Sequence, residues 1–305
     1  MSARHPIVGI TGSSGAGTST AVKVLKSMFE KMQINATLVE GDAFHAYDRE
    51  GSRQAIERAR IRGENFSLFG PAGNHLDRLE KLLADYGRCG SGMTRHYLHT
   101  EAEAAEHNQL IGTFTPWEPL PEATEFLLYE GLHGGYQGDD ADIASHMDLL
   151  LGVTPVINLE WIQKIRRDTA ERGHQATDVM RTILRRMPDY VNYIVPQFSR
   201  TDINFQRVPL VDTSNPFEVR EIPPPEESLI VIHINENGRL SKDLLPRVQQ
   251  VPNALRSNPQ TLIVPGPQMA QAMEVILGPS IRALAQRRQD ATRTAPGDAP
   301  NQGTN

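Results

Sequence analysis

The sequence has little of what disulfide crosslinking, membrane insertion or general nucleic-acid binding would require. Cys89 is the only cysteine among 305 residues, which excludes an intrachain disulfide and leads us to expect a cytoplasmic protein. No apolar run approaches the ~20 residues of a membrane-spanning helix, and the first residues lack the pattern of a signal peptide. The formal net charge of −6 argues against a nucleic-acid partner.

Short apolar runs, many of them rich in β-branched residues, alternate with stretches of helical character. Strands that are buried on both faces have this composition, so the pattern predicts an α/β fold with a mostly parallel central sheet. We expect one domain over residues 1–286 and a polar, disordered tail over 287–305. The expected strands are 6–12, 36–44, 126–131, 147–155, 208–214, 228–235 and 261–266.

Residues 12–19, GSSGAGTS, match the Walker A pattern G-x-x-x-x-G-K-[ST] except at the lysine position, which is Thr18. The loop lies between an expected strand and a stretch with helical spacing, which is the context that a phosphate loop needs. Backbone N–H groups and the helix dipole attract phosphate without a side-chain cation, and Ser19 is placed to ligate Mg²⁺. We predict that the nucleotide phosphates bind to Gly12, Ser13, Ser14, Gly15, Ala16, Gly17, Thr18, Ser19 and Thr20. The alternative is an ordinary Gly/Ser-rich turn.

A second helical region, residues 156–190, is rich in arginine. Between Gln163 and Met187 it holds seven basic residues and three acidic ones. In small-molecule kinases a helical lid of this kind closes over the nucleotide and excludes water. Lys164, Arg167 and Arg172 are therefore candidates to replace the missing loop lysine. The alternative is a solvated basic helix face.

Two acidic residues lie at the ends of expected strands. Asp42 follows the second run and Glu130 ends the third, and ligands of open α/β sheets bind beyond the carboxyl ends of the strands. Phosphoryl transfer to a hydroxyl needs a carboxylate to orient or deprotonate the nucleophile and acidic groups to hold Mg²⁺. Basic side chains just beyond Asp42 would suit a sugar-phosphate acceptor, although an Asp before a loop is more often a turn former. These side chains are His45, Arg49 and Arg53.

Arg95, Tyr97 and His99 occupy alternate positions, so in an extended backbone they would face the same way and could contact a phosphorylated polyhydroxyl substrate. A polar surface strand or loop is an equal alternative. A metal site at His96 and His99 is not expected, because the spacing is not that of a metal motif and no cysteine is near.

Several longer segments resemble phosphoribulokinase, in the form found in photosynthetic and chemoautotrophic proteobacteria. They include TGSSGAGTST (11–20), EGDAFH (40–45), YEGLHG (129–134), VTPVINLEWIQKI (153–165) and residues 195–217. The resemblance implies a three-layer P-loop kinase fold with a mixed sheet and a helical lid. It also implies that MgATP phosphorylates ribulose 5-phosphate to ribulose 1,5-bisphosphate in the Calvin cycle. The lysine-free loop is itself a property of this bacterial form.

The resemblance assigns roles to individual residues. Asp42 matches the base that takes the proton of the terminal sugar hydroxyl, and Asp168 matches a second essential acid on the metal–nucleotide. Glu130 occupies the Walker B position, and Lys164 matches the lysine that supports the transferred phosphoryl group. The expected metal ligands are Ser19, Glu130 and Asp168.

The resemblance also implies the substrate contacts. His45 and Arg49 match groups that bind the sugar phosphate, whereas Arg53 stands where the family has lysine, which keeps the charge but changes its geometry. The matching lid and substrate arginines are Arg167, Arg172 and Arg186.

Regulation is a further implication of the resemblance. The dithiol switch of plant-type relatives is excluded within this chain, because Cys89 has no partner cysteine. The bacterial form is activated by NADH, inhibited by AMP and octameric, and Arg256 and His233 lie in the region expected for the effector site. An arginine would be expected at His233.

Two other functions remain open at this stage. The first is a phosphotransferase similar to uridine kinase or pantothenate kinase, although those proteins keep the loop lysine and their acceptors carry no phosphate. The second is a non-catalytic nucleotide sensor on the same fold, which would be expected to have lost acids at the site. Asp42, Glu130 and Asp168 are all present.

Overall fold

A computed structural model of the chain describes residues 4–154, 156–170, 173–218, 221–236, 238–240 and 250–293. Its centre is an eight-stranded sheet in the order β2-β5-β1-β6-β7-β8-β10-β9. The strands are β1 (Ile7–Thr11), β2 (Ala36–Glu40), β5 (Phe126–Gly131), β6 (Leu149–Val153), β7 (Ile203–Pro209), β8 (Ser228–Ile234), β9 (Leu255–Asn258) and β10 (Thr261–Pro265). A separate pair is β3 (Met93–Thr94) and β4 (Glu118–Pro119). The helices are α1 (Thr18–Lys31), α2 (Arg49–Ile61), α3 (Leu76–Cys89), α4 (Glu101–Glu106), α5 (Ile157–Ala170), α6 (Ala176–Asp189) and α8 (Met269–Arg293).

The sheet is mixed and mostly parallel, as expected. Strands β2, β5, β1, β6 and β7 run parallel to one another, and β8, β10 and β9 add three antiparallel pairings at the β7 side. The parallel half is thus the half that carries the glycine-rich loop, which follows β1.

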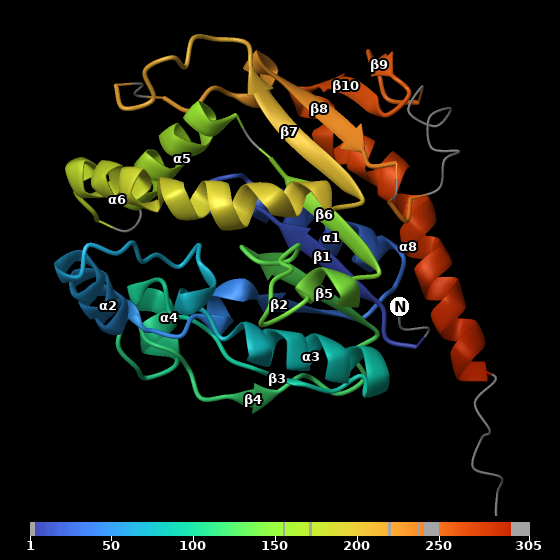
Figure 1. Cartoon of the computed structure of the whole chain (residues 1–305). Helices are drawn as coiled ribbons and strands as arrows, with labels where there is room; N and C mark the ends of the chain where they lie inside the picture. Colours follow the sequence, from blue (N-terminus) through green and yellow to red (C-terminus); the bar gives the residue numbers. More distant parts are fainter. Residues whose placement is uncertain are drawn as a thin grey trace, which may run out of the picture.

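The fold has three layers, with the sheet between two layers of helices. Successive residues of a strand point to opposite faces of the sheet. In β5, Phe126 and Leu128 pack in the cluster that includes α1 and α8, whereas Leu127 and Tyr129 pack in the cluster that includes α3. Figure 1 shows α8 running beside the sheet on the side of α1, with α3 on the other side. The strands therefore read as continuous apolar runs because both of their faces are covered by helices.

Two strand predictions need correction. The run 208–214 overlaps only the end of β7, which begins at Ile203, and Leu210 and Val211 beyond it are exposed. The buried residues of β7 alternate with polar ones such as Asn204, so its first half lacks the continuous apolar signal. Strand β9 was not expected, because all four of its residues are exposed and only Leu255 is apolar.

The described part of α8 crosses residue 287, where the polar tail was expected to begin. Helix α8 continues to Arg293, and its buried residues include Ile281 and Leu284. Arg288, in the segment expected to be disordered, is within 2.9 Å of the Glu125 carboxylate. Residues 294–305 of the expected tail lie outside the described residues.

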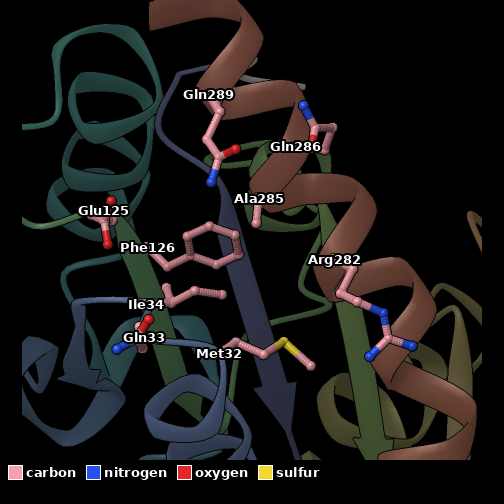
Figure 2. Close-up of a pocket in the computed structure, with 9 residues that line it drawn as sticks. All are labelled: Met32, Gln33, Ile34, Glu125, Phe126, Arg282, Ala285, Gln286 and Gln289. Carbon is pink, nitrogen blue, oxygen red and sulfur yellow. The ribbon is translucent and has the colours of Figure 1, made fainter.

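A hollow of about 390 Å³ lies between α8 and the beginning of β5 (Figure 2). Phe126 and Ile34 line its apolar part, and Arg282 lies at its rim. Because β5 begins here and the glycine-rich loop follows the end of the parallel strand β1, the hollow is at the opposite edge of the sheet from that loop. Within the described ranges, no helix combines the length and apolar character needed to cross a membrane.

Candidate active site

The carboxyl ends of the parallel strands bring the predicted acids and the glycine-rich loop together. Thr11, the last residue of β1, pairs with Gly131 of β5 and with Gly152 of β6. Glu40, the last residue of β2, pairs with Glu130. The loop after β1, Asp42 after β2 and Glu130 at the end of β5 therefore share one edge of the sheet, as predicted for an open α/β sheet.

The loop needs its glycines for two different reasons. Gly17 caps α1 with φ 96°, in the left-handed region that glycine adopts without steric cost. Gly15 has φ 101°, and a Cβ atom there would lie 3.0 Å from the carbonyl oxygen of Glu160 and 3.2 Å from the Cβ of Lys164. The loop thus packs directly against the backbone of α5, the first helix of the predicted lid.

Thr18, at the position of the usual lysine, is buried and its hydroxyl donates a hydrogen bond to Glu130. Burial raises the pKa of Glu130 to about 7, although the bond from Thr18 opposes the shift. Ser19 is exposed at the start of α1, where its hydroxyl can reach a ligand. The residue that replaces lysine therefore positions the acid beside the loop.

Helix α5 supplies cations to the loop. Arg167 donates one hydrogen bond from Nη2 to the Ser14 hydroxyl at 2.8 Å. It also donates to Asp168 Oδ1 from Nε at 3.0 Å and from Nη2 at 2.9 Å. Lys164 donates from Nζ to Asp168 Oδ2 at 2.6 Å, and both of these side chains are less than a tenth exposed. Helix α5 therefore presents a buried ion pair and an arginine to the region of the loop.

Burial and neighbouring charges shift the pKa values of both members of this ion pair. Burial lowers the pKa of Lys164 to about 8, with a further contribution from the nearby Arg186, while Asp168 opposes the shift. Burial alone would raise the pKa of Asp168, but Lys164 and Arg167 hold it below its usual value. The pair is thus ionised at neutral pH, and Lys164 is close enough to its pKa to lose its charge in mildly alkaline solution.

Arg186, on α6, adds another cation. Its guanidinium lies over the ring of Phe69, 5.2 Å from the centroid, and burial lowers its pKa to about 10. Its buried Nε has no hydrogen-bond partner among the residues that the structure describes. A buried guanidinium nitrogen without a partner is costly, and an anionic ligand between α6 and the loop would provide one.

On the other side of the site, two histidines hold the Asp42 carboxylate. His45 Nε2 lies 3.1 Å from Oδ1, and His99 Nε2 lies 3.2 Å from Oδ2. Burial would raise the pKa of Asp42, but the two imidazoles hold it well below its usual range. The Asp42 side chain is still 38% exposed, so its ionised carboxylate can meet a substrate hydroxyl.

Arg95 contacts the backbone next to Asp42, and Tyr97 contacts the His99 ring. Arg95 donates to the carbonyl oxygens of Ala43 and His45 at 2.7 and 2.8 Å, and its guanidinium lies 3.6 Å from the ring centroid of Phe114. The Tyr97 ring meets that of His99 edge to face, with centroids 4.7 Å apart. Of the predicted set, His99 contacts Asp42 directly, Tyr97 contacts His99, and Arg95 binds the backbone of Ala43 and His45 next to Asp42.

Other predicted residues are placed differently. Arg53 is 78% exposed and pairs with Glu50 of its own helix, and Arg49 is exposed at the start of α2. Arg172 lies outside the described residues. His233 and Arg256 lie on β8 and β9, on the far side of the sheet from β2.

Gln197 was missed by sequence reasoning, yet it joins three segments under the loop. It is 1% exposed; its Oε1 accepts from the Thr11 hydroxyl at 3.0 Å and from the Gly135 N–H at 2.9 Å. Its Nε2 donates to the carbonyl oxygens of Leu132 and Tyr193. A buried glutamine at this junction has no periodic signal in the sequence, because three of its four partners are distant in the chain.

Among the described residues, no three His, Cys, Asp or Glu side chains are grouped so that they could hold a metal ion by themselves. Mg²⁺ usually binds to one or two protein ligands and to phosphate oxygens, so this result is compatible with a metal that arrives with a nucleotide. The Ser19 hydroxyl and the Glu130 carboxylate have the oxygen chemistry that Mg²⁺ prefers.

Comparison with known proteins places this geometry in a family. Residues 7–214 match the phosphoribulokinase/uridine kinase family. The chain is 49% identical to a probable phosphoribulokinase of Escherichia coli over 290 residues, covering 95% of this chain and 99% of that protein. It is 50% identical to a phosphoribulokinase of Rhizobium meliloti, over 94% of this chain and 99% of the relative. The solved structure of phosphoribulokinase from Rhodobacter spheroides matches with a TM-score of 0.84 and 41% identity, over 94% of this chain and 100% of that one. The chain belongs to the phosphoribulokinase/uridine kinase family.

Proposed function

We propose that this protein transfers the γ-phosphoryl group of MgATP to the terminal hydroxyl of ribulose 5-phosphate, giving ribulose 1,5-bisphosphate for the Calvin cycle. The observation that carries the proposal is the contact of α5 with the lysine-free loop, which brings Lys164 and Arg167 to the loop. The relatives that are 49–50% identical over nearly the whole chain are named phosphoribulokinase.

In the proposed mechanism, the loop amides and the α1 dipole hold the triphosphate. Ser19 and Glu130 would hold Mg²⁺. Asp168 would join them once Lys164 and Arg167 turn from its carboxylate toward the phosphates. When bound there, Mg²⁺ would supply positive charge that offsets the negative charge on the phosphates. Lys164 and Arg167 orient and stabilise the transferred group from the lid. These cations act mainly in the transition state, where the transferred charge spreads over several oxygens.

The acceptor side lies around Asp42. Asp42 takes the proton of the sugar hydroxyl, and His99 and Tyr97 border the place where that hydroxyl would approach. The cationic side chains assigned to the phosphorylated substrate are His45, Arg49, Arg53, Arg95, Arg172 and Arg186. Arg49 and Arg53 are exposed and reach substrate only from the α2 side, whereas His45 supports Asp42.

Regulation, assembly and location are part of the same proposal. We infer activation by NADH and inhibition by AMP, with an effector site near His233 and Arg256, and a homo-octamer in the cytoplasm. What supports this is the likeness to bacterial phosphoribulokinases, and Arg256 is exposed on the edge strand β9, where an effector can reach it. No nucleic-acid or membrane partner is proposed.

The family also includes uridine kinase, so the acceptor needs a direct test. We expect ADP release with MgATP and ribulose 5-phosphate, and background rates with uridine or pantothenate, in an assay coupled to ADP formation. ADP release with uridine or pantothenate but not with the sugar phosphate would assign the protein to the alternative phosphotransferases. No turnover with any acceptor, together with ATP binding, would indicate a nucleotide sensor.

Asp42→Asn tests the base. An amide cannot accept the hydroxyl proton, so kcat should fall about 100- to 10,000-fold, while ATP binding measured by calorimetry stays near that of the wild type. Asp77→Asn, at an exposed position of α3, is the matched control and should be unchanged. Near-normal turnover in Asp42→Asn would remove this residue from the role.

Lys164 can be tested through its lowered pKa. The free protein loses this charge as the pH rises through about 8, so kcat/KM for MgATP should decrease above that pH. In Lys164→Arg the decrease should move to higher pH, because guanidinium stays protonated. Lys164→Met should be severely impaired at every pH, and Lys26→Met, on the exposed face of α1, should be normal. An unchanged alkaline decrease in Lys164→Arg would show that another group is responsible.

A further inference from the structure

The side chain of Asn74 is held in a single orientation beside the site. Its Nδ2 donates to two carbonyl oxygens, that of Leu68 at 2.9 Å and that of Gly70 at 2.8 Å. Both amide hydrogens are therefore used, and the opposite orientation would direct Oδ1 at two other oxygens. Oδ1 accordingly points the other way, toward His45 Nδ1 at 2.8 Å.

This contact fixes where His45 carries a proton. An amide oxygen can only accept a hydrogen bond, so Nδ1 of His45 must carry the hydrogen. The ring is 5% exposed, and the backbone pairs on both sides of the contact, with the Ala46 N–H donating to Gly73 O and the His75 N–H to Phe44 O. These bonds, together with the antiparallel bridge between His45 and Asn74, keep the ring from turning away.

The other ring nitrogen then has only one favourable state. Nε2 of His45 lies 3.1 Å from Asp42 Oδ1. With Nδ1 already protonated, a neutral ring would point the Nε2 lone pair at the carboxylate, which is repulsive. The contact is attractive when Nε2 is protonated as well, that is, when the ring is an imidazolium.

The contacts of the neighbouring histidines do not require a second proton in the same way. His133 is buried, with Nε2 on the Phe69 carbonyl oxygen, and burial lowers its pKa to about 4, so it is neutral. His99 needs only one proton, on Nε2, to donate to Asp42 Oδ2. Of these three histidines, His45 is the one whose two contacts together require both ring nitrogens to be protonated.

We propose that Asn74 is a positioning residue of this site: by accepting from Nδ1 of His45, it holds the ring as an imidazolium whose Nε2–H orients the Asp42 carboxylate. The inference rests on the proposed function, in which Asp42 is the base. Asn74 touches neither substrate nor Asp42 and acts through His45 alone. Without an acceptor at Nδ1, His45 could move its single proton to Nε2 and reach Asp42 as a neutral ring.

Neutron diffraction on crystals of the full-length protein, at the pH of the activity assay, locates the deuterons directly. We expect deuterons on both nitrogens of His45 in the wild type and in Asn74→Asp, whose carboxylate still accepts from Nδ1. In Asn74→Leu we expect one deuteron, on Nε2. A single deuteron on wild-type His45, or two deuterons in Asn74→Leu, would overturn the inference.

Kinetics give a second measurement. Asn74→Leu should lower kcat about 10- to 100-fold and leave KM for ATP unchanged, as expected when an orienting partner of a catalytic group is lost. Asn74→Asp should recover part of this loss, because one carboxylate oxygen still accepts from Nδ1 although the other faces the Leu68 and Gly70 carbonyl oxygens. Asn35→Leu removes a comparable amide bond, to Ala123 O, away from the site and is the matched control. An equal loss in Asn74→Leu and Asn74→Asp would contradict the proposal, because both lose the bonds to Leu68 and Gly70.

The outcomes separate this inference from the proposed function. If the wild type forms no ADP with ribulose 5-phosphate, the proposed function fails, and the deuteron positions still decide whether Asn74 sets the state of His45. If the wild type is active and its His45 carries one deuteron, only the inference fails. If Asn74→Leu does not fold, the wild-type and Asn74→Asp deuteron positions and the kinetics of Asn74→Asp remain decisive.

Discussion

The site depends on the close packing of α5 against the glycine-rich loop. Gly15 makes this packing possible, because any side chain there would meet the backbone of Glu160 and the Cβ of Lys164. Arg167 then reaches Ser14, and Lys164, which takes part in the contact, forms a buried ion pair with Asp168 one helical turn further along α5. A loop that has lost its own lysine thereby gains cations from a segment more than a hundred residues away.

The surroundings of Asp42 differ from those of the glycine-rich loop. The cations near the loop lie on α5, whereas Asp42 is held by contacts that involve three other residues. His45 and His99 hold its oxygens, and Arg95 holds the backbone on which it sits. A carboxylate held in place at Asp42, with the cations Lys164 and Arg167 on a separate helix, would suit a reaction in which a hydroxyl must meet a phosphoryl group in line and without water. The Gln197 side chain links the end of β1 to the segment after β5, through hydrogen bonds with Thr11 and Gly135.

Much of this could be predicted from the sequence, and the failures have physical causes. Strands covered on both faces are apolar throughout, so most of the parallel strands were found, and the loop and Asp42 followed from their positions at strand ends. Strand β9 and the last turns of α8 were missed because they are polar and exposed. Asn74 and Gln197 were missed because a single polar side chain that bonds to groups elsewhere in the fold, such as His45 or Thr11, leaves no periodic pattern. The basic character of residues 156–190 indicated a lid, but only the structure shows that Arg167 touches Ser14.

The most direct test of the account is a crystal structure of the protein with an ATP analogue, Mg²⁺ and ribulose 5-phosphate. We expect the triphosphate on the amides of residues 12–19 and Lys164 Nζ within about 3.2 Å of a β- or γ-phosphate oxygen, after release of Asp168 toward the metal. A triphosphate bound elsewhere, or a bound triphosphate with Lys164 still on Asp168 and no lid cation on its phosphates, would contradict the account.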